Sequence, residues 1–189
     1  GSLARVIFNK IKNVSYTLVD IPESLYFSYL FIKSNFPDKS VVWATDSFDF
    51  EKIDEYDFIF VPVVLYQRLA GQEVDLFINT CSLGEMRNEV ICMWMDMIQN
   101  KMKTKYFFGV NRFLNTVHRK NVKHHWRLME NKCYSHFDPQ WKILRWRIEP
   151  EFAQCPYYEG FASRCLEFIA ERDNSVTYDV SVQMSKQIV

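Results

Sequence analysis

Glycine is scarce in this chain, and its distribution excludes one common arrangement for holding a nucleotide. Only 5 of the 189 residues are glycine. The first segment typical of a β-strand, Tyr16–Asp20, is not preceded by the glycine-rich loop that an open α/β sheet normally uses for this purpose. These residues by themselves therefore lack one part of a complete nucleotide site.

Three further absences narrow the class of protein. The five cysteines include no close pair of the kind that zinc sites use, and their odd number favours reduced thiols and a cytoplasmic location. No apolar stretch reaches the roughly 20 residues that a membrane-spanning helix needs, so no membrane insertion is expected. Basic and acidic residues number 23 each, and this zero net charge argues against a nucleic-acid partner.

The composition that remains is that of a folded α/β domain. With 48% hydrophobic residues, global disorder is excluded, and the length fits one domain, predicted over residues 1–170 with a basic insert or lid at 112–138 and a polar tail at 171–189. The patterns predict helices over 2–12, 22–35 and 84–102, and strands over 16–21, 41–44, 57–61, 74–79, 106–110, 141–148 and 157–165, with 63–69 ambiguous. This succession predicts a mostly parallel sheet with an antiparallel carboxyl-terminal edge.

The stretch from Val74 to Met86 is the most informative in the chain. An apolar run stops at a small polar cluster, Asn79 to Ser82, and then opens into a long amphipathic segment. A buried parallel strand has this pattern where its carboxyl end meets a ligand crevice. Asp20 ends an earlier strand in the same way, and it is interpreted either as an acceptor for ribose hydroxyls or as a cap of the following helix.

Two motifs carry a resemblance to a known family. Residues 16–25 read Tyr-Thr-Leu-Val-Asp-Ile-Pro-Glu-Ser-Leu, and residues 77–86 read Phe-Ile-Asn-Thr-Cys-Ser-Leu-Gly-Glu-Met. Together they resemble the sugar O-methyltransferase family, class I enzymes dependent on S-adenosylmethionine, and the resemblance spans most of residues 1–165. It implies a Rossmann-like class I methyltransferase sheet that is incomplete at its amino end, because Gly1 would be the last glycine of the family's first loop.

The resemblance also implies roles for individual residues. Gly1, Asp20, Asn79 and Thr80 would bind S-adenosylmethionine, with Asp20 on the ribose. Ser82 and Asn111 would contact a sugar or glycan acceptor, and Glu85 would be the general base for its hydroxyl. The residues leave a second reading open for Ser82 and Glu85, since serine followed three residues later by glutamate is also the signature of a helix capping box.

The basic insert contains four histidines, His118, His124, His125 and His136, among lysines and arginines. His124 and His125 are assigned to the acceptor site if the insert covers the crevice as a lid. No carboxylate pattern completes a ligand set, so no metal is predicted. A solvated loop and a nucleic-acid patch over 119–127 remain as alternatives.

The alternation of Trp141 and Trp146 with Arg145 and Arg147 suits either a carbohydrate platform or an ordinary sheet with one buried face. The function predicted from these features is O-methylation of a sugar hydroxyl, with this chain inactive by itself. The alternative from another class is a non-catalytic α/β binding module. Oligomeric state stays open, a homo-oligomer included.

Overall fold

The computed structural model describes residues 1–83, 86–117, 125–128, 136–148 and 164–176, and they fall into two compact units, Gly1–Gln72 and Glu73–Val189. Unit 1 contains α1 (Ser2–Lys10), β1 (Tyr16–Asp20), α2 (Pro22–Asn35), β2 (Val41–Trp43) and β3 (Phe58–Pro62), with 3₁₀ segments at Phe50–Glu55 and Val63–Leu69. Unit 2 contains β4 (Glu73–Thr80), α3 (Asn88–Asp96) with a π-helical turn at Met97–Lys101, β5 (Lys103–Val117), β6 (His125–Leu128), β7 (Trp141–Ile148) and β8 (Arg164–Arg172).

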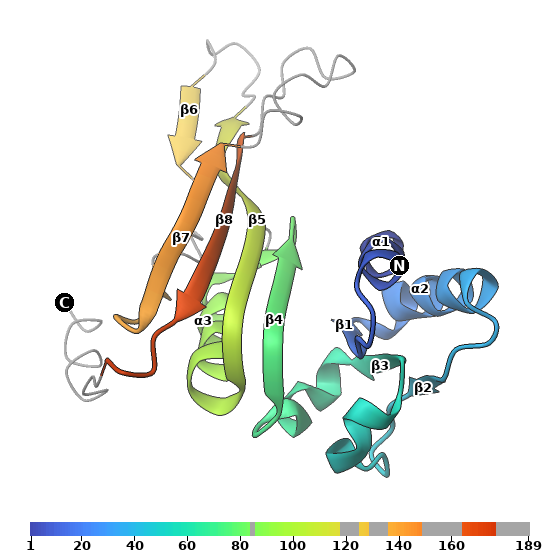
Figure 1. Cartoon of the computed structure of the whole chain (residues 1–189). Coiled ribbons are helices and arrows are strands. Elements are labelled where there is room, and N and C mark those ends of the chain that lie inside the picture. Colours follow the sequence, from blue (N-terminus) through green and yellow to red (C-terminus); the bar gives the residue numbers. More distant parts are fainter. Residues whose placement is uncertain (84–85, 118–124, 129–135, 149–163, 177–189) are drawn as a thin grey trace. The chain divides into compact units, whose positions relative to one another are not determined.

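The sheet of unit 1 is parallel, in the order β1-β3-β2 (Figure 1). The central strand β3 is buried at every residue, as expected for a parallel strand that is covered on both faces. Phe58 and Phe60 pack against Leu25 and Ile32 of α2. Pro22 begins α2 because its missing N–H costs nothing in the first turn of a helix.

The sheet of unit 2 is mixed, in the order β4-β5-β8-β7 with β6 added to the far part of β5. β4 and β5 are parallel, and β8 pairs antiparallel with both β5 and β7. α3 packs on one face, where the rings of Trp94 and Phe77 lie 6.3 Å apart (Figure 1). The predicted α/β fold with an antiparallel carboxyl-terminal edge is confirmed.

Several predicted boundaries were wrong. The helix predicted from residue 84 begins at Asn88, and its last turn widens to a π-helix. The strand predicted over 106–110 runs from Lys103 to Val117, so residues 112–117 and 125–128 are not irregular but belong to β5 and β6, which pair over 114–117 and 125–128. The late strand predicted over 157–165 shares only Arg164 and Cys165 with β8, which continues to Arg172 into the predicted tail. Residues 157–163 lie outside the described part. β5 is long because β8, distant in sequence, pairs with Tyr106 to Leu114, and the nearby β6 pairs with Leu114 to Val117.

β1 and β4 do not pair with each other in the described part of the chain, and each lies at the end of its own sheet. The resemblance implies a sheet that is incomplete at its amino end, and the strand expected to complete it stays a prediction. Among the described helices, none is long and apolar enough to cross a membrane.

Asp57 secures the entry to β3 and gives a prediction for unit 1. Its carboxylate accepts hydrogen bonds from the Ser40 amide and hydroxyl, each at 2.9 Å, and from the Lys39 ammonium at 3.2 Å. Burial raises the pKa of Asp57, but these hydrogen bonds outweigh it and hold the pKa below its ordinary value of 3.8. The stabilisation is therefore present at neutral pH and is lost as the pH falls through that depressed pKa.

We expect Ser40→Ala to raise the Asp57 pKa toward 3.8 and to destabilise unit 1 by about 1 kcal/mol at pH 7. The substitution removes the hydroxyl donor to the Asp57 carboxylate and leaves only the backbone amide of residue 40. A carboxyl-carbon NMR titration measures the pKa directly. Asp54, exposed in the neighbouring 3₁₀ segment, serves as the internal reference. An Asp57 resonance that titrates identically in both proteins would contradict the assignment.

Candidate functional site

The carboxyl end of β4 leads into a polar turn that is built on Asn79 and lies beside the middle of β5. The Asn79 side-chain amide donates to the Ser82 hydroxyl at 2.6 Å, and its carbonyl oxygen accepts from the Leu83 amide at 3.2 Å. The Leu83 side chain is buried, and it anchors this turn in the core. Asn79 and Ser82, both predicted site residues, therefore contact each other directly.

Cys81 lies in the same turn in a conformation that non-glycine residues rarely adopt. Its φ is +58°, in the left-handed region, and its amide donates to the Val110 carbonyl of β5 at 2.7 Å. The buried Asn111, next in β5, points its amide at the Asn79 carbonyl at 3.5 Å. Backbone conformations of this kind cluster at ligand sites. The structure thus brings together three of the predicted residues, Asn79, Ser82 and Asn111, while Thr80 is exposed beside them.

The capping-box reading of Ser82 and Glu85 does not fit α3. The helix begins at Asn88 and its N-cap is Arg87, with no side-chain capping bond, so Ser82 lies before the helix and not at its start. The Ser82 hydroxyl instead accepts a hydrogen bond from the Asn79 side-chain amide. Glu85 lies outside the described residues, and its role as a base stays a prediction.

In unit 1 the two predicted cofactor residues lie in one region. Asp20 ends β1 with an exposed carboxylate that accepts from the Ile21 amide at 2.8 Å, and α2 has no side-chain cap. The helix-cap reading of Asp20 is therefore wrong. The Gly1 nitrogen and the Asp20 carboxylate are close enough to interact electrostatically. Gly1 is the N-cap of α1, and its nitrogen lies 3.2 Å from the Ser28 hydroxyl oxygen.

Gly1 packs tightly against α2. A Cβ added at Gly1 would lie 2.9 Å from Cδ1 of Phe31, closer than side chains tolerate. Glycine therefore suits this position because the chain approaches α2 closely there. This contact is consistent with the predicted place of Gly1 at the end of a glycine-rich loop, which stays a prediction.

The histidines do not form a metal centre in the part of the chain that the structure describes, where no group of three or more ligating side chains occurs. His118 and His124 lie outside that part. His125 begins β6, paired with Val117 of β5, which places its backbone in a strand and not in a loop. His136 contacts two residues of α3, Asn88 and Cys92, which sequence reasoning missed. The i, i+4 spacing of Asn88 and Cys92 predicts that they are neighbours, but nothing in the sequence pairs them with His136.

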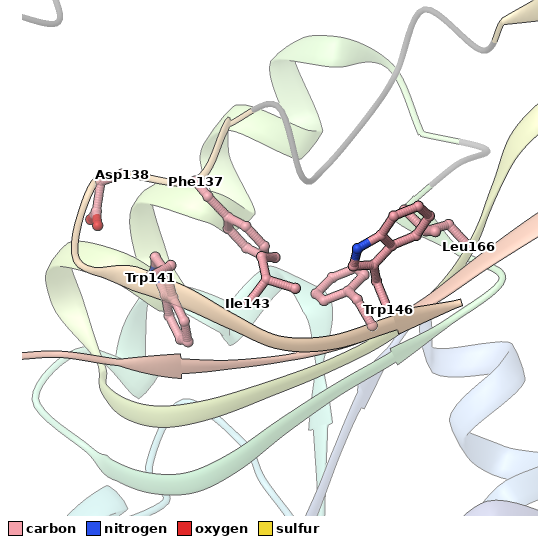
Figure 2. Close-up of a pocket in the computed structure, with 7 residues that line it drawn as sticks. Phe137, Asp138, Trp141, Ile143, Trp146 and Leu166 are labelled. Carbon is pink, nitrogen blue, oxygen red and sulfur yellow. The ribbon is translucent and has the colours of Figure 1, made fainter. Parts of the chain in front are cut away.

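A largely apolar groove of about 420 Å³ lies on the α3 side of β7 and β8 (Figure 2). Trp141 is buried at one end beside Phe137, whereas Trp146 is 66% exposed at the other end. The two tryptophans are five positions apart, which in a regular strand would place them on opposite faces. The irregularity between Ile143 and Arg145 shifts the alternation by one residue, so both rings line the same groove.

Of these two tryptophans, only Trp146 can serve as the predicted carbohydrate platform, because Trp141 belongs to the core. The adjacent arginine on the other face, Arg147, forms an ion pair with Glu167 at 2.7 Å. Along the register, Trp146 is level with Phe168, Gly109 and Asn79. Three strand spacings separate Trp146 from Asn79, about 14 Å.

A scan against protein-family models and a search of curated proteins find no match to this chain. Among solved structures, one that it is similar to is described as "Crystal structure of rRNA methylase from Escherichia coli", with 14% identity and a TM-score of 0.42. The match covers 91% of this chain and 62% of that structure, so the chain spans less than two thirds of its length.

Proposed function

We propose that this chain is part of an S-adenosylmethionine-dependent O-methyltransferase whose acceptor is a sugar hydroxyl. The observation that carries the proposal is the position of Asp20, an exposed carboxylate at the carboxyl end of a parallel strand that caps no helix. Ligands of open α/β sheets bind at the carboxyl ends of strands, and an acidic residue there accepts hydrogen bonds from ribose hydroxyls.

The polar turn at the end of β4 would line the methyl-transfer crevice. Asn79, Ser82 and Asn111 are held by mutual hydrogen bonds and so present fixed amide and hydroxyl groups. Methyl transfer from a sulfonium is a direct displacement, in which alignment of donor and acceptor supplies much of the rate. A rigid turn serves that purpose, and when bound the cofactor supplies the electrophilic methyl group.

The sugar acceptor follows from the motif resemblance, with support from Trp146. An exposed indole ring level with Asn79 offers an apolar face on which the C–H groups of a sugar ring can stack. Glu85, just beyond Ser82 in sequence, is proposed to accept the proton of the sugar hydroxyl as the methyl group is transferred.

Calorimetric titration with S-adenosylmethionine tests the cofactor assignment. We expect Asp20→Ala to weaken binding at least about tenfold, because one charge-assisted hydrogen bond contributes roughly 1.5–3 kcal/mol. Glu23→Ala is the matched control, since Glu23 is an exposed carboxylate in the first turn of α2. Circular dichroism verifies that both variants keep the fold.

A form of the polypeptide extended at its amino end is titrated in parallel, because the resemblance places the glycine-rich loop before Gly1. No binding by either form would reject the methyltransferase proposal and favour the non-catalytic module. Equal losses in Asp20→Ala and Glu23→Ala would reject the ribose role of Asp20 while leaving the cofactor assignment in place.

A further inference from the structure

A cysteine and an asparagine of α3 contact one histidine from a later segment, and the three side chains have the arrangement of a nucleophilic triad. The Cys92 sulfur lies 3.8 Å from Nδ1 of His136, within reach of a sulfur donor, and Nε2 of His136 lies 3.1 Å from Oδ1 of Asn88. Asn88 and Cys92 are one helical turn apart on α3, and His136 reaches them from 44 residues further along the chain. All three belong to unit 2.

The two contacts of His136 are those of a base held between a thiol and an amide. Oδ1 of Asn88 can only accept a hydrogen bond. In the tautomer that satisfies this contact, Nε2 of His136 therefore carries the hydrogen and donates it to Oδ1. In the neutral ring Nδ1 then has a lone pair, and this lone pair faces the Cys92 thiol. Histidine with an orienting amide and an adjacent thiol is a recurring way to activate cysteine.

The protonation state of His136 suits a base. Partial burial lowers the pKa of His136 below its ordinary value of 6.5, so the ring is largely neutral at pH 7 and can accept a proton. Cys92 is partly exposed, whereas Cys165 in β8 is fully buried. The thiol that has a base beside it is therefore also one that a small molecule can reach.

We propose that Cys92 is a site of reversible modification by small disulfides, with His136 as its base and Asn88 as the positioning residue. His136 takes the thiol proton, the Cys92 sulfur attacks one sulfur of the disulfide, and the S–S bond breaks. The departing thiolate then receives the proton from His136, which restores the neutral ring. Electrons and protons balance, and the disulfide is the oxidant.

Disulfide exchange fits this triad better than acyl transfer does. Exchange needs a thiolate, a proton acceptor and access to the sulfur. Acyl transfer needs in addition hydrogen-bond donors directed at a developing oxyanion. Cys92 lies in the second turn of α3, where the backbone amides already hydrogen-bond within the helix.

The test measures how fast oxidised glutathione forms a mixed disulfide at each cysteine, by peptide mass spectrometry at pH 7. Cys133 and Cys155, outside the described residues, are replaced by serine in every protein. We expect Cys92 to react at least about tenfold faster than Cys81, which is also partly exposed, because a positioned base accelerates proton transfer. Cys165 should stay unmodified and so reports that the fold is intact.

Variants separate the roles of the two partners. We expect His136→Gln to slow Cys92 about tenfold without changing Cys81, and Asn88→Ala to slow it less. Asn88→Asp, which keeps an acceptor oxygen, should restore the rate, whereas the exposed neighbour Glu89→Ala should leave it unchanged. Equal rates at Cys92 and Cys81, or a Cys92 rate unaffected by His136→Gln, would overturn the proposal. None of these outcomes bears on cofactor binding, which the calorimetric titration measures separately.

Discussion

Replacing Asp138 with alanine is expected to destabilise unit 2 by about 3–5 kcal/mol, the cost of breaking a buried ion pair by removing one partner. The Asp138 carboxylate is 2% exposed and lies 3.5 Å from the Arg172 guanidinium, which is itself only 12% exposed. Arg172 also stacks on Trp141, with 5.7 Å from its guanidinium carbon to the ring centre. Without Asp138 the largely buried guanidinium would keep its hydrogen bond to Oε1 of Gln140 but lose the carboxylate that balances its charge.

The same side chain shapes the turn into β7. Oδ1 of Asp138 accepts from the Gln140 amide at 2.9 Å, and the Asp138 amide donates to the buried side-chain oxygen of Gln99 at 2.9 Å. Asp138 thereby connects the π-helical turn after α3 to the start of β7. Loss of its carboxylate removes the charge pair and this turn bond together.

Urea unfolding monitored by tryptophan fluorescence measures the effect. Trp43, the tryptophan of unit 1, is replaced by phenylalanine in all proteins so that the signal reports on unit 2. Asp75→Ala, at an exposed position of β4, is the control and should change stability by no more than about 0.5 kcal/mol.

A double-mutant cycle isolates the ion pair. Removing Asp138 and Arg172 together should cost clearly less than the two single losses added, because the second removal leaves no charge unpaired. Additive losses, or a cost of less than about 1 kcal/mol for Asp138→Ala, would show that the pair does not stabilise the unit.

The sequence predicted those elements whose signals are local. The apolar residues of β3, Phe58 to Val61, make a continuous run because the strand is covered on both faces. Pro22 predicted the start of α2, and Asn79 predicted the polar end of β4. Each of these features follows from a few neighbouring residues.

What the sequence did not predict depends on contacts between distant segments. The length of β5 follows in large part from its pairing with β8, more than 45 residues further along the chain. The common face of Trp141 and Trp146 follows from a strand irregularity that has no glycine or proline to announce it. His136 contacts Cys92 because the chain returns to α3 after β5 and β6.

Replacing Phe168 with alanine is expected to destabilise unit 2 by about 3–5 kcal/mol, as for other fully buried aromatic residues. Phe168 is 2% exposed, and its ring contacts those of Phe107 and Phe137 at 5.2 and 5.4 Å between centres. These rings fill the space between α3 and the sheet. A methyl group in place of the Phe168 ring would leave a cavity that this packed cluster cannot close completely.

Gly109 makes this prediction sharper, because the Phe168 ring lies directly over it. A Cβ built at Gly109 would lie 2.4 Å from Cζ of Phe168, so Gly109→Ala alone should cost about 1–3 kcal/mol through overpacking. In the Phe168→Ala background the added methyl group enters the cavity, and strands favour alanine over glycine. We therefore expect the same substitution to become neutral or stabilising there. Urea unfolding of the four proteins measures the effect of Gly109→Ala in each background. An equal loss of stability in both backgrounds would mean that the Phe168 ring does not pack on Gly109.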